Sequence, residues 1–227
     1  MTRVFYITIL TFSFLIRNSC YCQNNPNKLF QLRIAPMNLV DPMTGTIQVG
    51  VQKRFNSMMA VAFDYGLKFD KLSFSSQKND RKNYNYYKYK VEIKYFLGGK
   101  TSQASQIDHP YFSIQGFYFP QHYRKDNSWL IKNGKSYHFD HSMIDRKAIA
   151  TSILFGDEHI SGRLVFDGYV GVGLKQLNIK HQTTNAVDRP MSWFKEWLSL
   201  MPIDQYEGKF YRIHIPFGIK IGYIINN

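Results

Sequence analysis

The stretch RIHIPFGIKIGYIINN, residues 212–227, alternates with a period of two. Every second residue from Ile213 to Tyr223 is apolar, whereas the residues between them are polar, charged or small. This is the pattern of a β-strand with two different faces. In a soluble barrel the apolar face forms the core, but in a membrane-spanning barrel it contacts lipid and the polar face lines the lumen. The direction of the apolar face therefore decides the fold class.

The same alternation recurs in seven earlier segments, at residues 29–35, 46–55, 58–69, 87–97, 111–119, 146–155 and 163–176. Strands of soluble proteins average about 5 to 6 residues, whereas a tilted membrane-spanning strand needs about 9 to 11. Most of these segments have the greater length. The sequence therefore predicts an all-β fold, an eight-stranded antiparallel up-and-down transmembrane β-barrel.

The links between the predicted strands alternate in length. The first, third, fifth and seventh links are mostly the longer ones, with the fifth at residues 125–145 and the seventh at 178–208. Outer-membrane barrels have short periplasmic turns and longer outer loops. This pattern predicts that Asp126 and Asn185 lie outside the cell and that Asn56 lies in the periplasm.

The two faces of the predicted strands differ in a way that favours an outward apolar face. The polar faces combine charged residues with Gly and Ala, a set that fits a narrow lumen in which opposite charges pair. Aromatic residues lie on the apolar faces near the strand ends, as in the interfacial girdles of membrane barrels: Phe55, Phe69, Tyr87, Tyr95, Phe155 and Tyr223. A secreted soluble barrel that binds an apolar ligand is the alternative interpretation.

The N-terminus has the features of a secretory signal. Arg3 precedes an apolar run at residues 4–16, which is shorter than a bilayer-spanning helix, and Cys20 and Cys22 lie before a cleavage site at Gln23. We therefore divide the chain into a signal peptide, residues 1–22, and one barrel domain, residues 23–227, exported to the outer membrane. A lipoprotein anchor at one of the two cysteines is the rival interpretation. The mature domain has no cysteine, which excludes disulfides from it.

The formal net charge of the whole chain is +13. In an exported protein the anionic neighbours are lipid headgroups and surface polysaccharide, and no motif indicates a nucleic-acid partner. The expected partners are outer-membrane lipid and lipopolysaccharide, the barrel-insertion machinery, and an unidentified protein at the outer loops.

The charged residues on the polar faces are the candidate lumen network. Its predicted members are Arg54, Asp64, Lys90, Glu92, Lys94, Asp167, Lys175, Arg212 and Lys220, with Arg33, Lys68, Lys88, Arg146 and Arg163 on the same faces. Because an unpaired buried charge is costly, each acid is expected to contact a Lys or Arg. We interpret the network as a structural plug in a non-enzymatic protein. A narrow anion-selective path is the alternative.

Two motifs in the predicted fifth link bear on chemistry. His138, Asp140 and His141 have ligand types that suit a divalent metal, although such clusters on loops are usually only polar. The pair His141-Ser142 is compatible with an outer-membrane enzyme that acts on lipid, but such an enzyme needs an oriented nucleophile and base near the lipid boundary. We predict no catalytic residue, no metal and no cofactor.

The seventh link contains the apolar residues Trp193, Phe194 and Trp197 at helical spacing before Pro202. This pattern predicts a short helix in the last outer loop. The helix either covers the mouth of the barrel or lies in the outer leaflet, where the three residues would contact lipid or a partner.

The segments LRIAPMNLVDPMTGTIQVGVQKRF, VAFDYGLKF and LVFDGYVGVGLKQLNIKH resemble small outer-membrane β-barrel proteins of Bacteroidota-type bacteria, a family of unknown function described as DUF3575-like. The resemblance covers most of the mature chain and rests on strand patterns. It implies an eight-stranded barrel and implies no activity.

Overall fold

The computed structural model describes residues 29–39, 44–69, 81–97, 100–103, 106–132, 135–188 and 205–226. The strands are β1 (Phe30–Ile34), β2 (Thr46–Arg54), β3 (Met59–Lys68), β4 (Lys82–Phe96), β5 (Lys100–Gln103), β6 (Gln106–Lys132), β7 (Lys135–Ser161), β8 (Leu164–Thr184), β9 (Val187–Asp188), β10 (Gly208–His214) and β11 (Phe217–Asn226). A 3₁₀ turn, η2 (Pro36–Leu39), follows β1. Across the described residues, no helix is long and apolar enough to cross a membrane.

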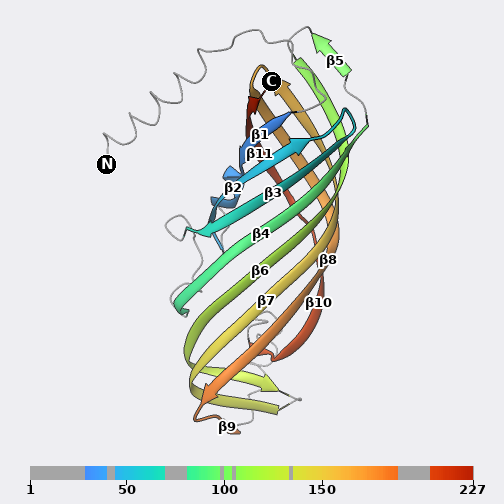
Figure 1. Ribbon diagram of the computed structural model, residues 1–227. Coiled ribbons are helices and arrows are strands. Elements are labelled where there is room, and N and C mark those ends of the chain that lie inside the picture. Colours follow the sequence, from blue (N-terminus) through green and yellow to red (C-terminus); the bar gives the residue numbers. More distant parts are fainter. Residues whose placement is uncertain are drawn as a thin grey trace, which may run out of the picture.

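The strands form one closed antiparallel ring (Figure 1). Neighbours along the chain pair from β1 through β4 and from β6 through β8, β4 pairs with β6, and both β10 and β11 pair with β8. The pairing of β1 with β11 closes the ring. Because β10 and β11 occupy one position interrupted near Pro216, the ring has eight positions. The predicted eight-stranded up-and-down barrel is confirmed.

The ring is strongly staggered. A row of directly paired residues starts at Arg33 on β1, passes through Gly50, Asp64, Lys90, Phe117, Ala150 and Lys175, and ends at Arg212 on β10. Arg33 itself pairs with Gly222 on β11. After one turn around the ring, the row therefore ends at Arg212, ten residues before the direct partner of Arg33. Such a shear tilts the strands against the barrel axis. Residues at one height of the lumen therefore come from different rows of paired residues.

The apolar faces point outward. Ile153 and Val172 are 62% and 59% exposed, whereas Glu92 and Lys94 on the opposite faces are 0% exposed. A soluble barrel would bury the apolar face, so the soluble alternative is wrong for this chain. The prediction that the apolar face of the last strand segment points outward is confirmed. Ile213, Ile215, Phe217 and Ile219 are all exposed. We call this outward apolar surface the apolar belt.

The apolar belt ends before the strands do. On β7, exposed Ile149 is followed toward the hairpin tip by the outward residues Lys147 and Asp145. On β8, exposed Leu174 is followed by polar residues as far as Lys180 and beyond. The strands β6 and β7 have 27 residues each and reach far beyond β1 to β3 (Figure 1). We call residues 119–132, 135–148 and 176–184 the outer extension.

The outer extension corrects two predicted loops. Residues 125–145 were expected to form a loop, but Lys132 pairs with Lys135 and the ladder continues along almost the whole segment. Residues 178–184 likewise continue β8. The Asn133-Gly134 dipeptide is a typical signal of a two-residue hairpin turn, and it marks this connection in the sequence.

Within the outer extension the two faces exchange polarity. Its inward face contributes to two buried apolar clusters. One joins Phe119, Ala148 and Leu177 to Tyr86 of β4, and the other consists of Tyr123, Ile144 and Ile179. Because its outward face is polar, this part of the sheet has the pattern of a soluble β-structure with its own small core. The change of pattern marks the level at which the barrel leaves the apolar belt.

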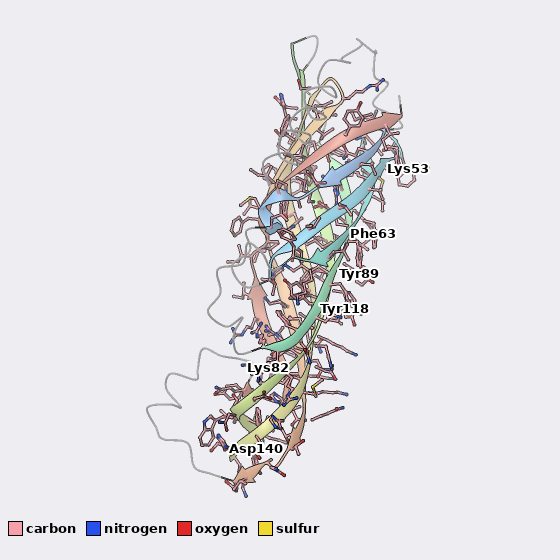
Figure 2. All side chains as sticks on the ribbon, turned by 90° about the vertical axis from the view of Figure 1, so that its left-hand side faces the viewer. Lys53, Phe63, Lys82, Tyr89, Tyr118 and Asp140 are labelled. Carbon is pink, nitrogen blue, oxygen red and sulfur yellow. The ribbon has the colours of Figure 1, made fainter. Side chains whose placement is uncertain are left out.

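Aromatic residues gather on the outward face near this level. Phe63, Tyr89 and Tyr118 follow one another down the outside of β3, β4 and β6 (Figure 2). The ring centroid of Tyr89 lies 5.0 Å from that of Tyr65 and 6.3 Å from that of Tyr118. At the other end of the belt, Phe112 and Phe155 contact each other with centroids 5.2 Å apart. This is the placement of interfacial girdles in a membrane-spanning barrel.

Candidate functional site

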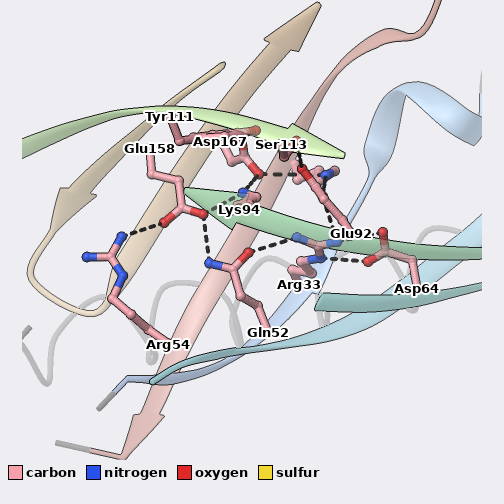
Figure 3. Close-up of polar contacts among 11 residues, drawn as sticks. Arg33, Gln52, Arg54, Asp64, Glu92, Lys94, Tyr111, Ser113, Glu158 and Asp167 are labelled. Atoms are coloured by element: carbon pink, nitrogen blue, oxygen red, sulfur yellow. Dashed lines mark hydrogen bonds and ion pairs between the residues drawn. The ribbon is translucent and has the colours of Figure 1, made fainter. Parts of the chain in front are cut away.

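A dense network of buried ion pairs lies on the inward faces of the strands, and Figure 3 shows its polar contacts. Arg33 of β1 forms a fork with Asp64 of β3: Nε donates to Oδ1 at 2.6 Å and one Nη donates to Oδ2 at 2.7 Å. The other Nη donates to Oε1 of Gln52 at 2.9 Å. Bidentate Arg–carboxylate pairs fix both partners in orientation. This pair therefore joins β1 to β3 across the intervening strand β2.

Glu92 of β4 is the first centre of the network. Its Oε2 accepts a hydrogen bond from Nζ of Lys220 at 2.6 Å and a longer one from Arg33 at 3.3 Å. Its Oε1 accepts a hydrogen bond from Oγ of Ser113 at 2.8 Å. Glu92 is fully buried, so these three donors replace the water that would otherwise solvate its charge.

Lys94 of β4 is the second centre. Its ammonium donates to Oε1 of Glu158 at 2.5 Å and to Oδ2 of Asp167 at 2.6 Å. The second oxygen of Asp167 accepts a hydrogen bond from the hydroxyl of Tyr111 at 2.6 Å. Arg54 donates to Oε2 of Glu158 at 3.2 Å. Strands β2, β4, β6, β7 and β8 are thereby connected through side chains as well as through the backbone.

The network is balanced in charge. Its carboxylates are Asp64, Glu92, Glu158 and Asp167, and its cations are Arg33, Arg54, Lys94 and Lys220. The side chains in these pairs are at most 5% exposed. Burial of charge is tolerated when each ion has partners with good geometry. We call these eight residues the lumen network.

The structure separates the predicted site residues into two groups. It brings Arg54, Asp64, Glu92, Lys94, Asp167 and Lys220 into the lumen network. Lys90, Lys175 and Arg212 do not join it, because none of them forms an ion pair with its carboxylates. They face the lumen closer to the outer extension.

Sequence reasoning missed Glu158 and three neutral residues that contact the network. The sequence predicts a link between strands at residues 156–162, but β7 continues to Ser161. The side chain of Glu158 therefore points into the lumen, where it is buried. The continuing alternation of Leu154, Gly156 and Glu158 on one face was the available signal. Gln52, Tyr111 and Ser113 lie on predicted strands, but nothing in their type distinguishes them from other lumen-facing residues.

The histidine motif of the predicted fifth link does not converge on one point. His138 packs its ring against Trp129, Asp140 accepts a hydrogen bond from Asn185, and His141 contacts Asp126. Among the described residues, no group of three or more His, Cys, Asp or Glu side chains is arranged to bind a metal ion.

Ser142 contacts a histidine other than its neighbour in sequence. Its Oγ lies 3.3 Å from Nδ1 of His181. Ser142 is only 1% exposed and lies on the inward face of the outer extension, away from the apolar belt. A nucleophile at this position does not reach a lipid substrate, so the geometry does not favour the lipid-directed enzyme.

Asp126 is the centre of a small group of polar contacts in the outer extension. Its carboxylate contacts Nζ of Lys82 at 2.7 Å, Nδ1 of His141 at 2.8 Å and Nε of Arg124 at 2.7 Å. Hydrogen bonds from Lys82, His141 and Arg124 hold the pKa of Asp126 well below its usual range. Trp193, Phe194 and Trp197, with the predicted loop helix, lie outside the described residues.

No protein-family model and no curated protein matches the chain. A solved structure of a major outer membrane protein from Thermus thermophilus is similar, with 8% sequence identity and a TM-score of 0.41, covering 87% of this chain and 99% of that chain. The resemblance to the DUF3575-like family therefore stays a likeness of strand patterns. The chain is, by its own strand pairing and faces, an eight-stranded β-barrel of the membrane-spanning type.

Proposed function

We propose that the protein is a non-enzymatic outer-membrane barrel with a closed lumen, which holds a folded β-extension above the outer surface. The observation that carries the proposal is the combination of the exposed apolar belt with the charge-balanced lumen network inside it. An apolar exterior of this extent favours lipid as its surroundings. The network fills the interior with paired side chains, which supports a structural role over a wide pore.

The outer extension supplies the part of the molecule that is available for interaction. Its outward face is polar and carries exposed groups such as Lys147 and His122, whereas its inward face has its own apolar core. A folded sheet presents side chains in fixed positions, unlike a long irregular loop. We propose that a surface ligand or an unidentified protein partner contacts this extension, while lipopolysaccharide contacts the upper edge of the belt.

The proposal also includes the route to the membrane. Residues 1–22 act as a cleaved signal peptide, and the insertion machinery folds the remaining chain into the outer membrane. With both ends of the ring on the periplasmic side, the short connection at residues 55–58 faces the periplasm. The hairpin at residues 132–135 and the end of β8 then face the exterior.

Cysteine labelling of whole cells tests this location and orientation. Ala186→Cys and Lys135→Cys are exposed positions on the proposed outer side, and Ser57→Cys is exposed on the proposed periplasmic side. An impermeant maleimide should label the first two in intact cells and Ser57→Cys only after the outer membrane is opened. The unmodified protein is the background control. Labelling of Ser57→Cys in intact cells would overturn the proposed orientation. Absence of the protein from the outer-membrane fraction would overturn the proposed location.

A further inference from the structure

Two lysines flank one asparagine on the outward face of β7, β8 and β10, which lie side by side in the ring (Figure 1). Asn178 of β8 pairs directly with Lys147 of β7 on one side and with Lys209 of β10 on the other. Both lysines are exposed, and Asn178 is half-buried. We call these three residues the lysine row.

Direct pairing keeps the three side chains of the lysine row close together. Neighbouring strands lie about 5 Å apart, so the backbones of Lys147 and Lys209 are separated by two such steps, about 10 Å. The three side chains point to the same side of the sheet, because directly paired residues share a face. Each lysine has a flexible four-carbon stem, so both ammonium groups can contact one ligand that lies over Asn178.

The lysine row lies at the edge of the apolar belt. The next outward row toward the belt contains Ile149, Gln176 and Tyr211, and Leu174 and Ile213 pair with each other in the row after it. Tyr211, Leu174 and Ile213 are 71%, 67% and 72% exposed, the largest exposed fractions among the large hydrophobic residues that the structure describes. A basic group above a strongly exposed apolar surface matches a lipid, whose charged head and apolar chains occupy successive levels.

The positive charge of the lysine row is not neutralised by the protein. Within the described ranges of the chain, Lys147 and Lys209 form no hydrogen bond or ion pair. Lys180, on the same face of β8, adds a third exposed cation. Asp145 lies directly opposite Lys180, but its carboxylate contacts a histidine at 2.5 Å. Glu207, two residues before Lys209, forms an ion pair with a different lysine at 3.0 Å.

We propose that the lysine row binds the phosphates of a phosphorylated saccharide lipid in the surrounding leaflet. Lys147 and Lys209 contact phosphate oxygens, and the side-chain amides of Asn178 and Gln176 contact the saccharide between them. A lipid with a phosphate at each end of a disaccharide matches two cations on separate strands with amides between them. The acyl chains lie on the exposed apolar residues of β8 and β10 below the row.

This inference names the residues through which the barrel contacts lipopolysaccharide, and it rests on the proposed function for the choice of leaflet. The lysine row lies on the side of the belt from which the outer extension rises. If that side is the outer one, the row meets the leaflet in which lipopolysaccharide resides. A phospholipid has one phosphate and no saccharide, and it is therefore the comparison lipid in the test.

Native mass spectrometry of the folded barrel in detergent tests the site, with bis-phosphorylated lipid A as the probe. Lipid A should bind, and its dephosphorylated form should bind about tenfold more weakly or not at all. Lys147→Gln and Lys209→Gln should each weaken binding about fivefold, the usual contribution of one basic residue near an anionic lipid surface. Lys53→Gln is the matched control, because Lys53 is exposed on the outward face of β2 near the opposite end of the belt. Its removal should leave the affinity unchanged.

Equal binding of dephosphorylated lipid A, or equal weakening by Lys53→Gln, would overturn the proposal. Phosphatidic acid should bind more weakly than lipid A, and equal affinity would contradict the saccharide lipid as the ligand. Lys147 and Lys209 are exposed, so both variants should keep the heat-modifiable folded band, which separates lost binding from lost folding.

The binding test and the labelling test can fail separately. Binding in detergent does not depend on how the barrel is oriented in a cell. Surface labelling of Ser57→Cys would therefore contradict the proposed function without removing the lipid site. Absence of lipid A binding, with labelling as expected, would overturn only the lipid site.

Discussion

Ile219→Arg should block insertion of the barrel into lipid. Ile219 lies halfway along the outward row from Ile213 to Ile225 and is 49% exposed. A charge on the lipid face near the bilayer midplane costs roughly 2–4 kcal/mol, a large part of the stability of a small domain. We expect the heat-modifiable folded band to be lost or strongly reduced when the variant is refolded into lipid vesicles.

Gln182→Arg is the matched control for this variant. Gln182 is exposed on the outward side of β8, but it lies in the outer extension beyond the apolar belt. The Gln182→Arg variant should therefore insert into lipid as the wild type does. Gly218→Ala is not a suitable control on the lumen side, because the new methyl group would lie 2.8 Å from the hydroxyl oxygen of Tyr169. Equal insertion of the two Arg variants would contradict the assigned faces.

Glu92→Gln should destabilise the folded barrel by about 3–5 kcal/mol, the usual cost of breaking a buried ion pair on one side. The substitution keeps the shape of the side chain but removes the charge that accepts hydrogen bonds from Lys220 and Arg33. Two cations then remain buried with fewer partners. The measurement is the urea midpoint for unfolding from lipid vesicles, followed by the mobility of the folded band.

Two comparisons isolate the buried charge as the cause. Asp157→Asn makes the same kind of change at an exposed position of β7 and should leave the midpoint almost unchanged. Glu92→Gln combined with Lys220→Met should lose less stability than the sum of the single variants, because the unpaired ammonium is gone. The wild type should show no open channel in a planar bilayer. A stable Glu92→Gln variant, or steady wild-type conductance, would contradict the closed lumen network.

The eight strands and their faces were predictable because lipid and lumen impose opposite polarity on alternating residues. That alternation assigned Ile219 to the lipid side and Glu92 to the lumen side. It did not reveal which charges meet. Asp64 pairs with Lys90 in the sheet, but it forms its ion pair with Arg33, which lies two strands away on the same row. The contact is possible because Gly50, between them, has no side chain: a Cβ there would lie 2.0 Å from Oδ1 of Asp64. The sequence does not show which strand positions stand next to Gly50.

The outer extension was missed for a different reason. Its alternation is reversed, with Ile144 and Ile179 inward and polar residues outward, so a search for one apolar outward face ends at Ile149. A polar link of this length predicts a loop, because outer-membrane barrels usually have long outer loops. The hairpin dipeptide Asn133-Gly134 was the local signal that the strands continue.

The most direct test of the account is a nitroxide scan along β8 in lipid vesicles. Single cysteines replace Phe166, Val170 and Leu174 in the belt, and Lys180 and Gln182 in the extension, in mature chains that have no other cysteine. We predict that dissolved oxygen relaxes the first three labels strongly and a water-soluble nickel reagent relaxes the last two. Equal access of the nickel reagent to all five labels would mean that the apolar belt faces water, and it would contradict the membrane-spanning barrel.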